Sequence, residues 1–320
     1  MPESGEFLHS LLHLRRHLTT SELNHHPRVR WILSILGIAA VIAIGLWLRN
    51  LSPAASTAGL AHRWPWTRAT TVTLYFADGQ FLFPVSRQLP ASEGLPRAVL
   101  QALLAGPRAG TGLKNPIPEG VQIRSVQLAG GLARIDLSRA FLGNDSRTKA
   151  AETAVARTMM SLPGVSSVVL SVEGKPLGDP AKPVALLYYP SANGLVALPA
   201  SSENPREALT EYLAGPAGSE LTGLPRDARL LAYDYDPGDG LLSLNFAYSP
   251  SVRSLALDRP ERMRLLLLGL ITTLTEFPEV RAVRLDFQGQ TRLGLGQCSD
   301  LLRAPQPHPQ LLNDERLLER

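Results

Sequence analysis

Cysteine and histidine are nearly absent from most of this sequence. Cys298 is the only cysteine among 320 residues, which excludes an internal disulfide and any multi-cysteine zinc or iron–sulfur site. No histidine lies between Arg63 and Pro307. That stretch can therefore support neither Ser-His-Asp nor Cys-His catalysis, nor the usual catalytic zinc site, and only carboxylates remain for acid–base chemistry.

Charged residues are also scarce, at 19 % of the sequence, and they are nearly balanced. The formal net charge of +4 is shared equally between residues 1–50 and the rest of the chain. A body so close to neutral lacks the basic surface with which proteins bind nucleic acids. The sequence also lacks a phosphate-binding loop, a dinucleotide fingerprint and a nucleophile elbow. We therefore expect no enzymatic activity, no catalytic residue, no cofactor and no nucleic-acid partner.

One long apolar run, without a charged residue, extends from Trp31 to Leu48. As a helix it would be about 27 Å long, close to the hydrocarbon thickness of a bilayer. We predict a retained single-pass membrane helix at 31–48; the alternative is a cleaved signal peptide, whose apolar region is usually shorter. Residues suited to the membrane interface flank the run: Arg28, Arg30 and Trp31 at its start, and Trp47 and Arg49 at its end.

The basic residues favour a cytoplasmic N-terminus, which leaves the bulk of the chain outside the cell membrane. Residues 1–30 then form a cytoplasmic segment, and residues 49–70, rich in Ala, Ser, Thr and Pro, form a linker. His9, His13 and His17 would share one face of a helix in the first segment. They fit either a metal-binding or pH-responsive stripe or, with the leucines beside them, an amphipathic helix at the membrane surface.

The region after the linker contains the same unit twice. Five ordered landmarks recur at nearly constant separation, which indicates a tandem duplication. The pairs are Leu74-Tyr75-Phe76 with Leu187-Tyr188-Tyr189, Leu104–Pro107 with Leu213–Pro216, Ile117-Pro118 with Leu224-Pro225, Gly131-Leu132 with Gly240-Leu241, and Leu162–Val165 with Phe277–Val280. We place the two domains at residues 71–178 and 183–294.

Each unit predicts the order β-α-β-β-α-β, and hence an α+β domain with helices packed on a sheet. In the first unit we expect strands at 71–76, 121–128, 132–137 and 165–172, a helix from Pro96 to Gly106-Pro107 and a helix at 147–161. In the second we expect strands at 184–189, 229–235, 241–246 and 280–287, a helix capped by Asn204 and ended by Gly215-Pro216, and a helix at 260–276. Residues 295–320 are expected to be an extended tail whose end forms a short helix on a partner or frays.

The landmarks resemble the GerM domain family of sporulation and spore germination proteins, over about residues 70–177 and 183–292. The family pattern begins with a strand ending in LYF and an arginine after it, continues through a helix closing on L-x-GP, an IP-x-G turn and a G-x-A-x-ID strand, and ends in TLTEFP-x-V. The residues here that match this pattern, or stand at the equivalent place in the other unit, are Tyr75, Arg87, Gly106, Pro107, Pro118, Asp136, Tyr188, Gly215, Pro216, Asn245, Phe277 and Pro278.

This resemblance implies an outward-facing envelope protein whose two domains are similar to the ring-building modules of secretion channels. In endospore formers, tandem proteins of the family are linked to assembly of a channel complex between mother cell and forespore. Such relatives are typically lipoproteins, whereas this chain has an apolar run with no cysteine after it until Cys298. The expected partners are envelope or sporulation-complex proteins, with a homo-oligomer as a further possibility.

Two sets of polar residues are candidate sites. Asp136 in the first unit corresponds to Asn245 in the second, so a duplicated catalytic carboxylate is not indicated and a hydrogen bond within a turn or cap is favoured. Asp234, Asp236 and Asp239 could together bind calcium. The same string is also ordinary turn chemistry, and it lacks the distal glutamate of an EF-hand loop.

Three functions are compatible with this sequence. The first is a non-enzymatic envelope assembly protein that binds partners through exposed strand edges and helix faces. The second is a sensor or binding module for a small germinant or a cell-wall fragment, which predicts a polar or aromatic pocket between the domains. The third is a carboxylate-only cell-wall hydrolase, which requires two carboxylates about 5–10 Å apart in a cleft.

Overall fold

A computed structural model describes residues 69–91, 94–216, 221–289 and 298–318. The predicted membrane helix at 31–48, the residues that flank it and the His9–His17 stripe lie outside these ranges. Within the described ranges, no helix is both long enough and apolar enough to span a membrane. The apolar run at 265–271, which is too short to cross a bilayer, lies in a core helix of the second repeat.

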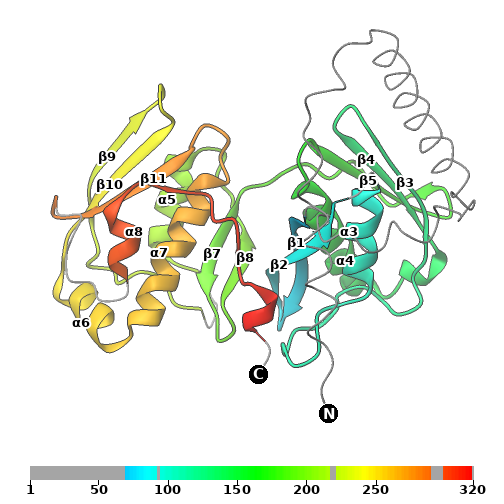
Figure 1. Ribbon diagram of the computed structural model, residues 1–320, viewed down its shortest axis with the longest axis horizontal. Coiled ribbons are helices and arrows are strands. Elements are labelled where there is room, and N and C mark those ends of the chain that lie inside the picture. Colours follow the sequence, from blue (N-terminus) through cyan, green and yellow to red (C-terminus); the bar gives the residue numbers. More distant parts are fainter. Residues whose placement is uncertain (1–68, 92–93, 217–220, 290–297, 319–320) are drawn as a thin grey trace, which may run out of the picture. The chain divides into compact units, whose positions relative to one another are not determined.

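The first repeat consists of a hairpin, a helix, a second hairpin, a second helix and a final pair of strands (Figure 1). Its elements are β1 (Ala69–Asp78), β2 (Phe81–Pro90), α3 (Leu95–Leu104), β3 (Ile123–Ala129), β4 (Leu132–Leu137), η2 (Arg139–Phe141), α4 (Asp145–Met160), β5 (Ser167–Val172) and β6 (Lys175–Pro176).

The second repeat has the same order through β11, with α6 in the place of η2, and α8, β12 and η4 follow β11. Its elements are β7 (Leu186–Pro190), β8 (Leu195–Pro199), α5 (Pro205–Ala214), β9 (Leu230–Asp236), β10 (Leu241–Phe246), α6 (Pro250–Asp258), α7 (Pro260–Thr275), β11 (Ala282–Phe287), α8 (Ser299–Arg303), β12 (Gln306–Pro307) and η4 (Glu315–Leu317).

The predicted strands and helices are all present, but the prediction missed the second strand of each repeat and the two-residue strands β6 and β12. Apart from β6, β12 and the short helices, the observed order is β-β-α-β-β-α-β, because β1 is followed by β2 and β7 by β8. β2 has a run of four buried residues, Phe83–Ser86, and contains Pro84 and Pro90, so it lacks the alternation that marks a half-buried strand. β8 has only five residues, and each of the two strands depends on its hairpin partner.

The two repeats share a sheet. Its strands run in the order β1-β2-β8-β7, so each repeat contributes its first hairpin. β2 and β8 are antiparallel neighbours, with Leu82 opposite Ala197. At the hairpin ends, the carboxylate of Asp78 accepts hydrogen bonds from the side chains of Ser191 at 2.9 Å and Asn193 at 3.1 Å. The repeats are therefore fused through the backbone as well as through side chains.

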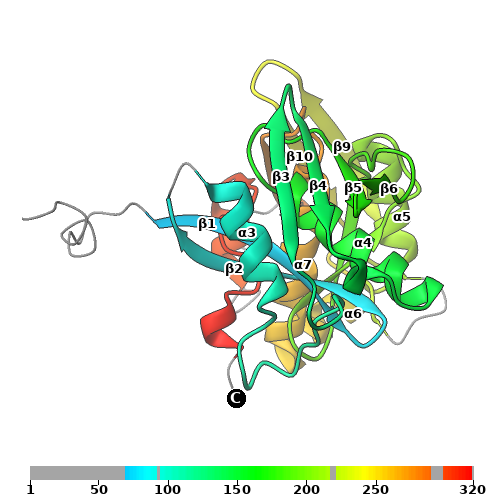
Figure 2. The ribbon, with the colours of Figure 1, turned by 90° about the vertical axis from the view of Figure 1, so that its right-hand side faces the viewer.

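Each repeat also has a sheet of its own. The strand orders are β3-β4-β5-β6 and β9-β10-β11-β12, with the two central strands parallel in both. A helix connects these central strands, as a parallel pair requires. Figure 2 shows β3, β4 and β5 side by side in the first repeat's sheet. Within the described residues, β3 and β9 are edge strands: each pairs with one neighbouring strand, β4 or β10, and has no strand on its other side.

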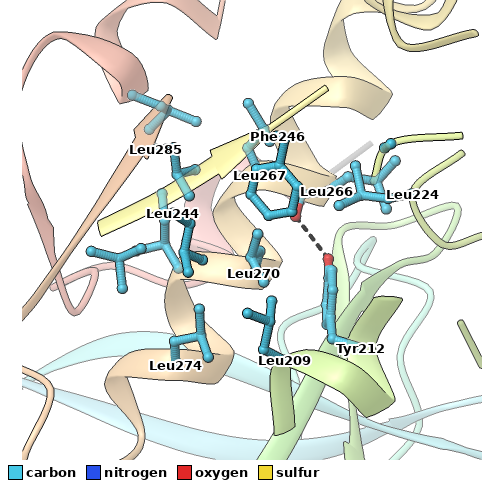
Figure 3. Packing of buried hydrophobic residues seen from close by; sticks show 14 of the residues in the cluster. Leu209, Tyr212, Leu224, Leu244, Phe246, Leu266, Leu267, Leu270, Leu274 and Leu285 are labelled. Atoms are coloured by element: carbon cyan, nitrogen blue, oxygen red, sulfur yellow. Dashed lines mark hydrogen bonds between the residues drawn. The ribbon is translucent and has the colours of Figure 1, made fainter. Parts of the chain in front are cut away.

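Helix α7 runs through the core of the second repeat (Figure 3). Leu266, Leu267 and Leu270 have no exposed surface, so burial of this helix supplies much of the apolar stabilisation. The hydroxyl of Tyr212 donates to the Leu266 carbonyl oxygen at 2.7 Å. The Tyr212 ring stacks on Tyr189 with ring centroids 4.7 Å apart.

The helix signals read from the sequence are confirmed at α3 and α5. The side chain of Asn204 accepts a hydrogen bond from the Glu207 N–H at 3.0 Å and so caps α5. Gly106 follows α3 and Gly215 ends α5, with φ angles of +85° and +82°. Both glycines adopt a left-handed conformation that other residues reach only with strain.

The C-terminal residues 304–318, which we call the C-terminal strap, return to the first repeat. The strap first pairs with β11 through β12 and then reaches β2, where Leu312 N–H donates to the Ser86 hydroxyl at 2.7 Å. The expectation that the end of the tail frays or forms a helix on a partner is wrong for these residues. Glu315 is 1 % exposed, because the strap packs on the chain itself.

Candidate functional site between the repeats

A cavity of about 490 Å³ lies where the two repeats and the C-terminal strap meet. Residues of β1 and α4, of β7 and α7, and of the strap line it. Its volume falls within the roughly 300–1,000 Å³ that is typical of small-molecule sites. The polar and charged lining residues are Thr71, Thr73, Tyr75, Arg157, Ser161, Tyr188, Thr275, Glu276, His308 and Gln310.

Two equivalent tyrosines meet at this cavity, one from each repeat. The hydroxyls of Tyr75 and Tyr188 are 3.4 Å apart, and the two residues are 5 % and 1 % exposed. The backbone N–H of Tyr75 donates to the Thr158 hydroxyl, and that of Tyr188 donates to the Thr273 hydroxyl, both at 3.0 Å. In both repeats, therefore, the strand that carries the tyrosine is bonded to the long helix in the same way.

The charged residues of the cavity differ between the repeats. Glu276 stands where the first repeat has Ser161, and Arg157 stands where the second has Thr272. The Tyr188 hydroxyl donates to Glu276 Oε1 at 2.7 Å. Burial raises the pKa of Tyr75 and of Tyr188, and the Glu276 carboxylate raises both further, so both hydroxyls remain protonated at neutral pH.

His308 brings an imidazole from the C-terminal strap to the cavity. Its Nδ1 lies 3.0 Å from the hydroxyl oxygen of Thr275. Desolvation lowers the pKa of His308, and the Glu276 carboxylate partly opposes that shift. The ring is therefore mostly neutral at pH 7.

An ion pair fastens the C-terminal strap to the first repeat. Arg87 Nε donates to Glu315 Oε2 at 2.6 Å, and the two side chains are 12 % and 1 % exposed. The same guanidinium donates to the carbonyl oxygens of Ala102 and Gly106, at 3.1 and 3.0 Å. The N–H of Arg108 also donates to Glu315, at 2.9 Å. Arg87, the arginine of the family pattern, thus joins β2, the end of α3 and the strap.

Most of the other residues of the family pattern lie in turns and in the core. Phe277 is 6 % exposed, and its carbonyl oxygen accepts a hydrogen bond from the Val280 N–H at 2.9 Å, which closes the turn after α7. Pro278 is exposed within that turn. Pro107, Pro118 and Pro216 are half-buried loop residues.

Asp136 and Asn245 occupy the same place in the two repeats. Asp136 accepts a hydrogen bond from the Gly174 N–H and Asn245 accepts one from the Gly289 N–H, both at 2.9 Å. Each glycine follows a residue with positive φ, in the turn after β5 in the first repeat and after β11 in the second. A carboxylate and an amide oxygen serve equally as acceptor, so both side chains hold the turn that follows the neighbouring parallel strand.

Of the three aspartates proposed as a calcium site, Asp234 lies within β9, Asp236 ends it, and Asp239 lies in the turn to β10. Asp236 Oδ1 accepts from the Gly238 N–H at 2.8 Å, an ordinary turn hydrogen bond. In the part of the chain that the structure describes, no three His, Cys, Asp or Glu side chains are grouped so that they could hold a metal ion. Asp234, Asp236 and Asp239 therefore do not form such a group.

Sequence reasoning named the tyrosines of this cavity but not its charged residues, Arg157, Glu276 and His308. In the sequence, Glu276 belongs to the TLTEFP motif and His308 to the C-terminal tail, and neither position indicated a place in a cavity. One signal could have found the carboxylate, because Glu276 and Ser161 differ at equivalent places in the duplication. The partner of Glu315 could not be found from spacing, since 228 residues separate it from Arg87.

Comparisons with known proteins agree with the duplication. The family model Germane, described as sporulation and spore germination, matches residues 73–178 and 186–293. Among solved structures, the tandem GerMN domains of the sporulation protein GerM from Bacillus subtilis match with a TM-score of 0.59 and 19 % identity, over 77 % of this chain and 99 % of that one. This likeness shows the fold of the two-repeat region.

Two further solved structures match a shorter part of the chain. A putative lipoprotein from Clostridium perfringens matches at 19 % identity and a TM-score of 0.27, over 36 % of this chain and 87 % of that one. The first GerMN domain of GerM from Bacillus subtilis matches at 22 % identity and a TM-score of 0.29, over 35 % and 86 %. No curated protein sequence matches significantly.

The two family matches cover both repeats of the shared-sheet structure and more than half of the sequence. Their order and extent follow the duplication of the tyrosine strands, the glycine–proline helix ends and the final turn. The chain therefore belongs to the Germane family of sporulation and spore germination domains and carries two of these domains in tandem.

Proposed function

We propose that this chain is a membrane-anchored, extracytoplasmic envelope protein without enzymatic activity, which assembles other proteins in sporulation or spore germination. Membership of the Germane family supports a role in one of these two processes. The apolar run Trp31–Leu48 supports the anchor, and the arginines around it support a cytoplasmic N-terminus.

The observation that carries the assembly function is the pair of edge strands, β3 and β9, on two fused repeats. Each pairs on one side within the described residues. An edge strand offers unpaired N–H and C=O groups that a strand of another protein can complete. Leu128 on β3 and Leu231 on β9 are 44 % and 51 % exposed, so each edge also offers apolar surface.

Site-specific photo-crosslinking in the host membrane tests this function. A photoreactive residue would replace Leu128 or Leu231 in the full chain, with Leu257 on α6, 61 % exposed, as the matched control. We expect discrete crosslinked products from the two edge positions during sporulation or germination and none from position 257. Equal labelling at all three positions, or none at the edges, would contradict the proposal.

The anchor has a separate test. Alkaline extraction should leave the full-length chain in the membrane fraction, and external protease should digest the repeats of intact protoplasts. The mass of the mature chain distinguishes the two interpretations of the apolar run, because a cleaved signal peptide would remove residues 31–48. A mature chain that begins after residue 48 would overturn the membrane anchor.

The cavity between the repeats supports a second candidate, a sensor or binding module for a small germinant or a cell-wall fragment. Such a module requires a polar or aromatic pocket between the domains, and Tyr75, Tyr188 and Glu276 line one there. Among the described residues that line the cavity, Glu276 is the single carboxylate. The cavity therefore does not supply the two carboxylates of the third candidate, a cell-wall hydrolase.

A further inference from the structure

The cavity between the repeats carries one positive and one negative group on opposite repeats. Arg157 belongs to α4 and Glu276 follows α7, and both line the cavity. No ion pair joins them, so their charged nitrogen and oxygen atoms are more than 4.0 Å apart. Both groups still act electrostatically on the Tyr75 hydroxyl, which places both charges near the tyrosine pair.

Each charged group retains capacity for a ligand. Among the described residues, Glu276 has one hydrogen-bond partner, the Tyr188 hydroxyl on Oε1, and its Oε2 is available. Arg157 donates through Nη1 to the Val184 carbonyl oxygen, which leaves most of its five N–H donors unused. Charges that face a shared cavity without neutralising each other favour a ligand that carries both opposite charges.

We propose that this cavity binds a small zwitterion, with the ligand ammonium group at Glu276 and the tyrosine hydroxyls and the ligand carboxylate at Arg157. A simple amine would meet the arginine, and a simple carboxylate would meet the glutamate, so each would bind with an unfavourable contact. The apolar lining residues Met160, Leu186 and Leu312 would contact the carbon chain between the two charged groups.

The arrangement also explains why the site requires the duplication. Neither repeat alone has both charges, since Ser161 replaces the glutamate in the first repeat and Thr272 replaces the arginine in the second. The C-terminal strap contributes His308 and Gln310 to the lining. The site is therefore complete only when both repeats and the strap are in place, and it is independent of the edge strands β3 and β9.

Calorimetric titration of the full chain in detergent micelles tests the proposal. The probes are glycine, β-alanine, 4-aminobutyrate and 6-aminohexanoate, which carry the same two charges at increasing separation, and diglycine, which distinguishes a peptide fragment from a free amino acid. Butylamine and butyrate are the singly charged controls. We expect at least one zwitterion to bind about tenfold or more tightly than both controls, since a charged hydrogen bond is lost with either.

Variants locate the binding. Glu276→Gln and Arg157→Gln should each weaken binding of the best zwitterion about tenfold or more. The matched controls are Glu279→Gln, an exposed glutamate near the end of α7, and Arg147→Gln, an exposed arginine on α4. Both should leave binding unchanged. Thermal unfolding of each variant would show that the fold is intact, and the comparison of probes on the wild-type chain does not depend on any variant.

Three results would overturn the proposal. The first is the absence of binding heat for every zwitterion. The second is binding of butylamine or butyrate as tight as that of the best zwitterion. The third is unchanged binding in both cavity variants, which would place the binding elsewhere on the chain.

Discussion

The two repeats share a backbone plan and differ in what surrounds it. In both, a tyrosine N–H donates to a threonine hydroxyl of the long helix at 3.0 Å, and an Asp or Asn side chain accepts from a turn glycine at 2.9 Å. The repeats differ in their outer contacts. In the first repeat, the C-terminal strap packs on β2. The second repeat has α6 where the first has η2, and it has α8 after β11. The duplication thus keeps the contacts that define the fold, and its differences lie where the two copies meet or are covered.

The largest expected effect concerns the strap, which the second repeat supplies and the first repeat receives. Glu315→Ala should lower the free energy of unfolding by about 3–5 kcal/mol, because it leaves the Arg87 guanidinium buried without its carboxylate. Chemical denaturation measures the change. Arg316→Ala is the control, since its ion pair with Asp314 is largely exposed on the arginine side and should contribute less than about 1 kcal/mol. Equal losses in both variants would show that the ion pair does not fasten the strap.

The second prediction compares equivalent positions on the two long helices. Gly269 of α7 stands where α4 has Ala154, and a Cβ at Gly269 would overlap the Tyr188 carbonyl oxygen. Gly269→Ala should therefore destabilise the chain by about 1–3 kcal/mol through overpacking. Ala154→Gly, which removes a buried methyl group, should cost about 1 kcal/mol from helix propensity. Thermal unfolding that shows no loss for Gly269→Ala would mean that α7 can move away from β7.

The third prediction concerns Cys298, the residue before α8, a helix of the second repeat. Burial raises the pKa of this thiol from 9.0 to about 11. Between these values the unfolded chain has lost the proton that the folded chain keeps, so stability should fall as pH rises from 9 to 11, by about 2 kcal/mol. Cys298→Ala should remove this part of the pH dependence in denaturation measured across that range. The same slope in the variant would assign it to other groups.

The smallest effect is expected for the turn that the repeats build with different residues. Asp136→Asn introduces the residue of the second repeat and should cost less than about 0.5 kcal/mol, because Asn245 already accepts the equivalent hydrogen bond. The exposed pair with Arg124 adds little. Asp136→Ala removes the acceptor and should cost about 1 kcal/mol in the same denaturation measurement. A large loss in the asparagine variant would show that the carboxylate charge itself matters.

Local signals explain the part of the fold that could be predicted. Asn204, Gly106 and Gly215 mark helix ends through chemistry that acts within a few residues. Alternating strands such as β10 and β11 were equally accessible, because one face is buried. β2 and β8 were missed, because their burial comes from the meeting of two repeats, which no window of one repeat contains.

The candidate site was only half predictable for the same reason. Tyr75 and Tyr188 stand out as equivalent landmarks, yet their hydroxyls meet only in the shared sheet. Arg157 is one of many arginines in the sequence, and its place in the cavity follows from how α4 packs beside β1. Glu315 belongs to a tail with the composition of an exposed helix, and its burial depends on an arginine 228 residues away.

The sequence by itself determined the duplication, the α+β class, the scarcity of catalytic side chains and the apolar run at 31–48, because each depends on residue types and short spacings. Only the tertiary structure decided that the repeats fuse through one sheet, that the C-terminal strap is fastened by Arg87, and that Arg157 and Glu276 share a cavity. Those features join residues that are far apart in the chain, and their energies arise from burial and partner geometry, which exist only after folding.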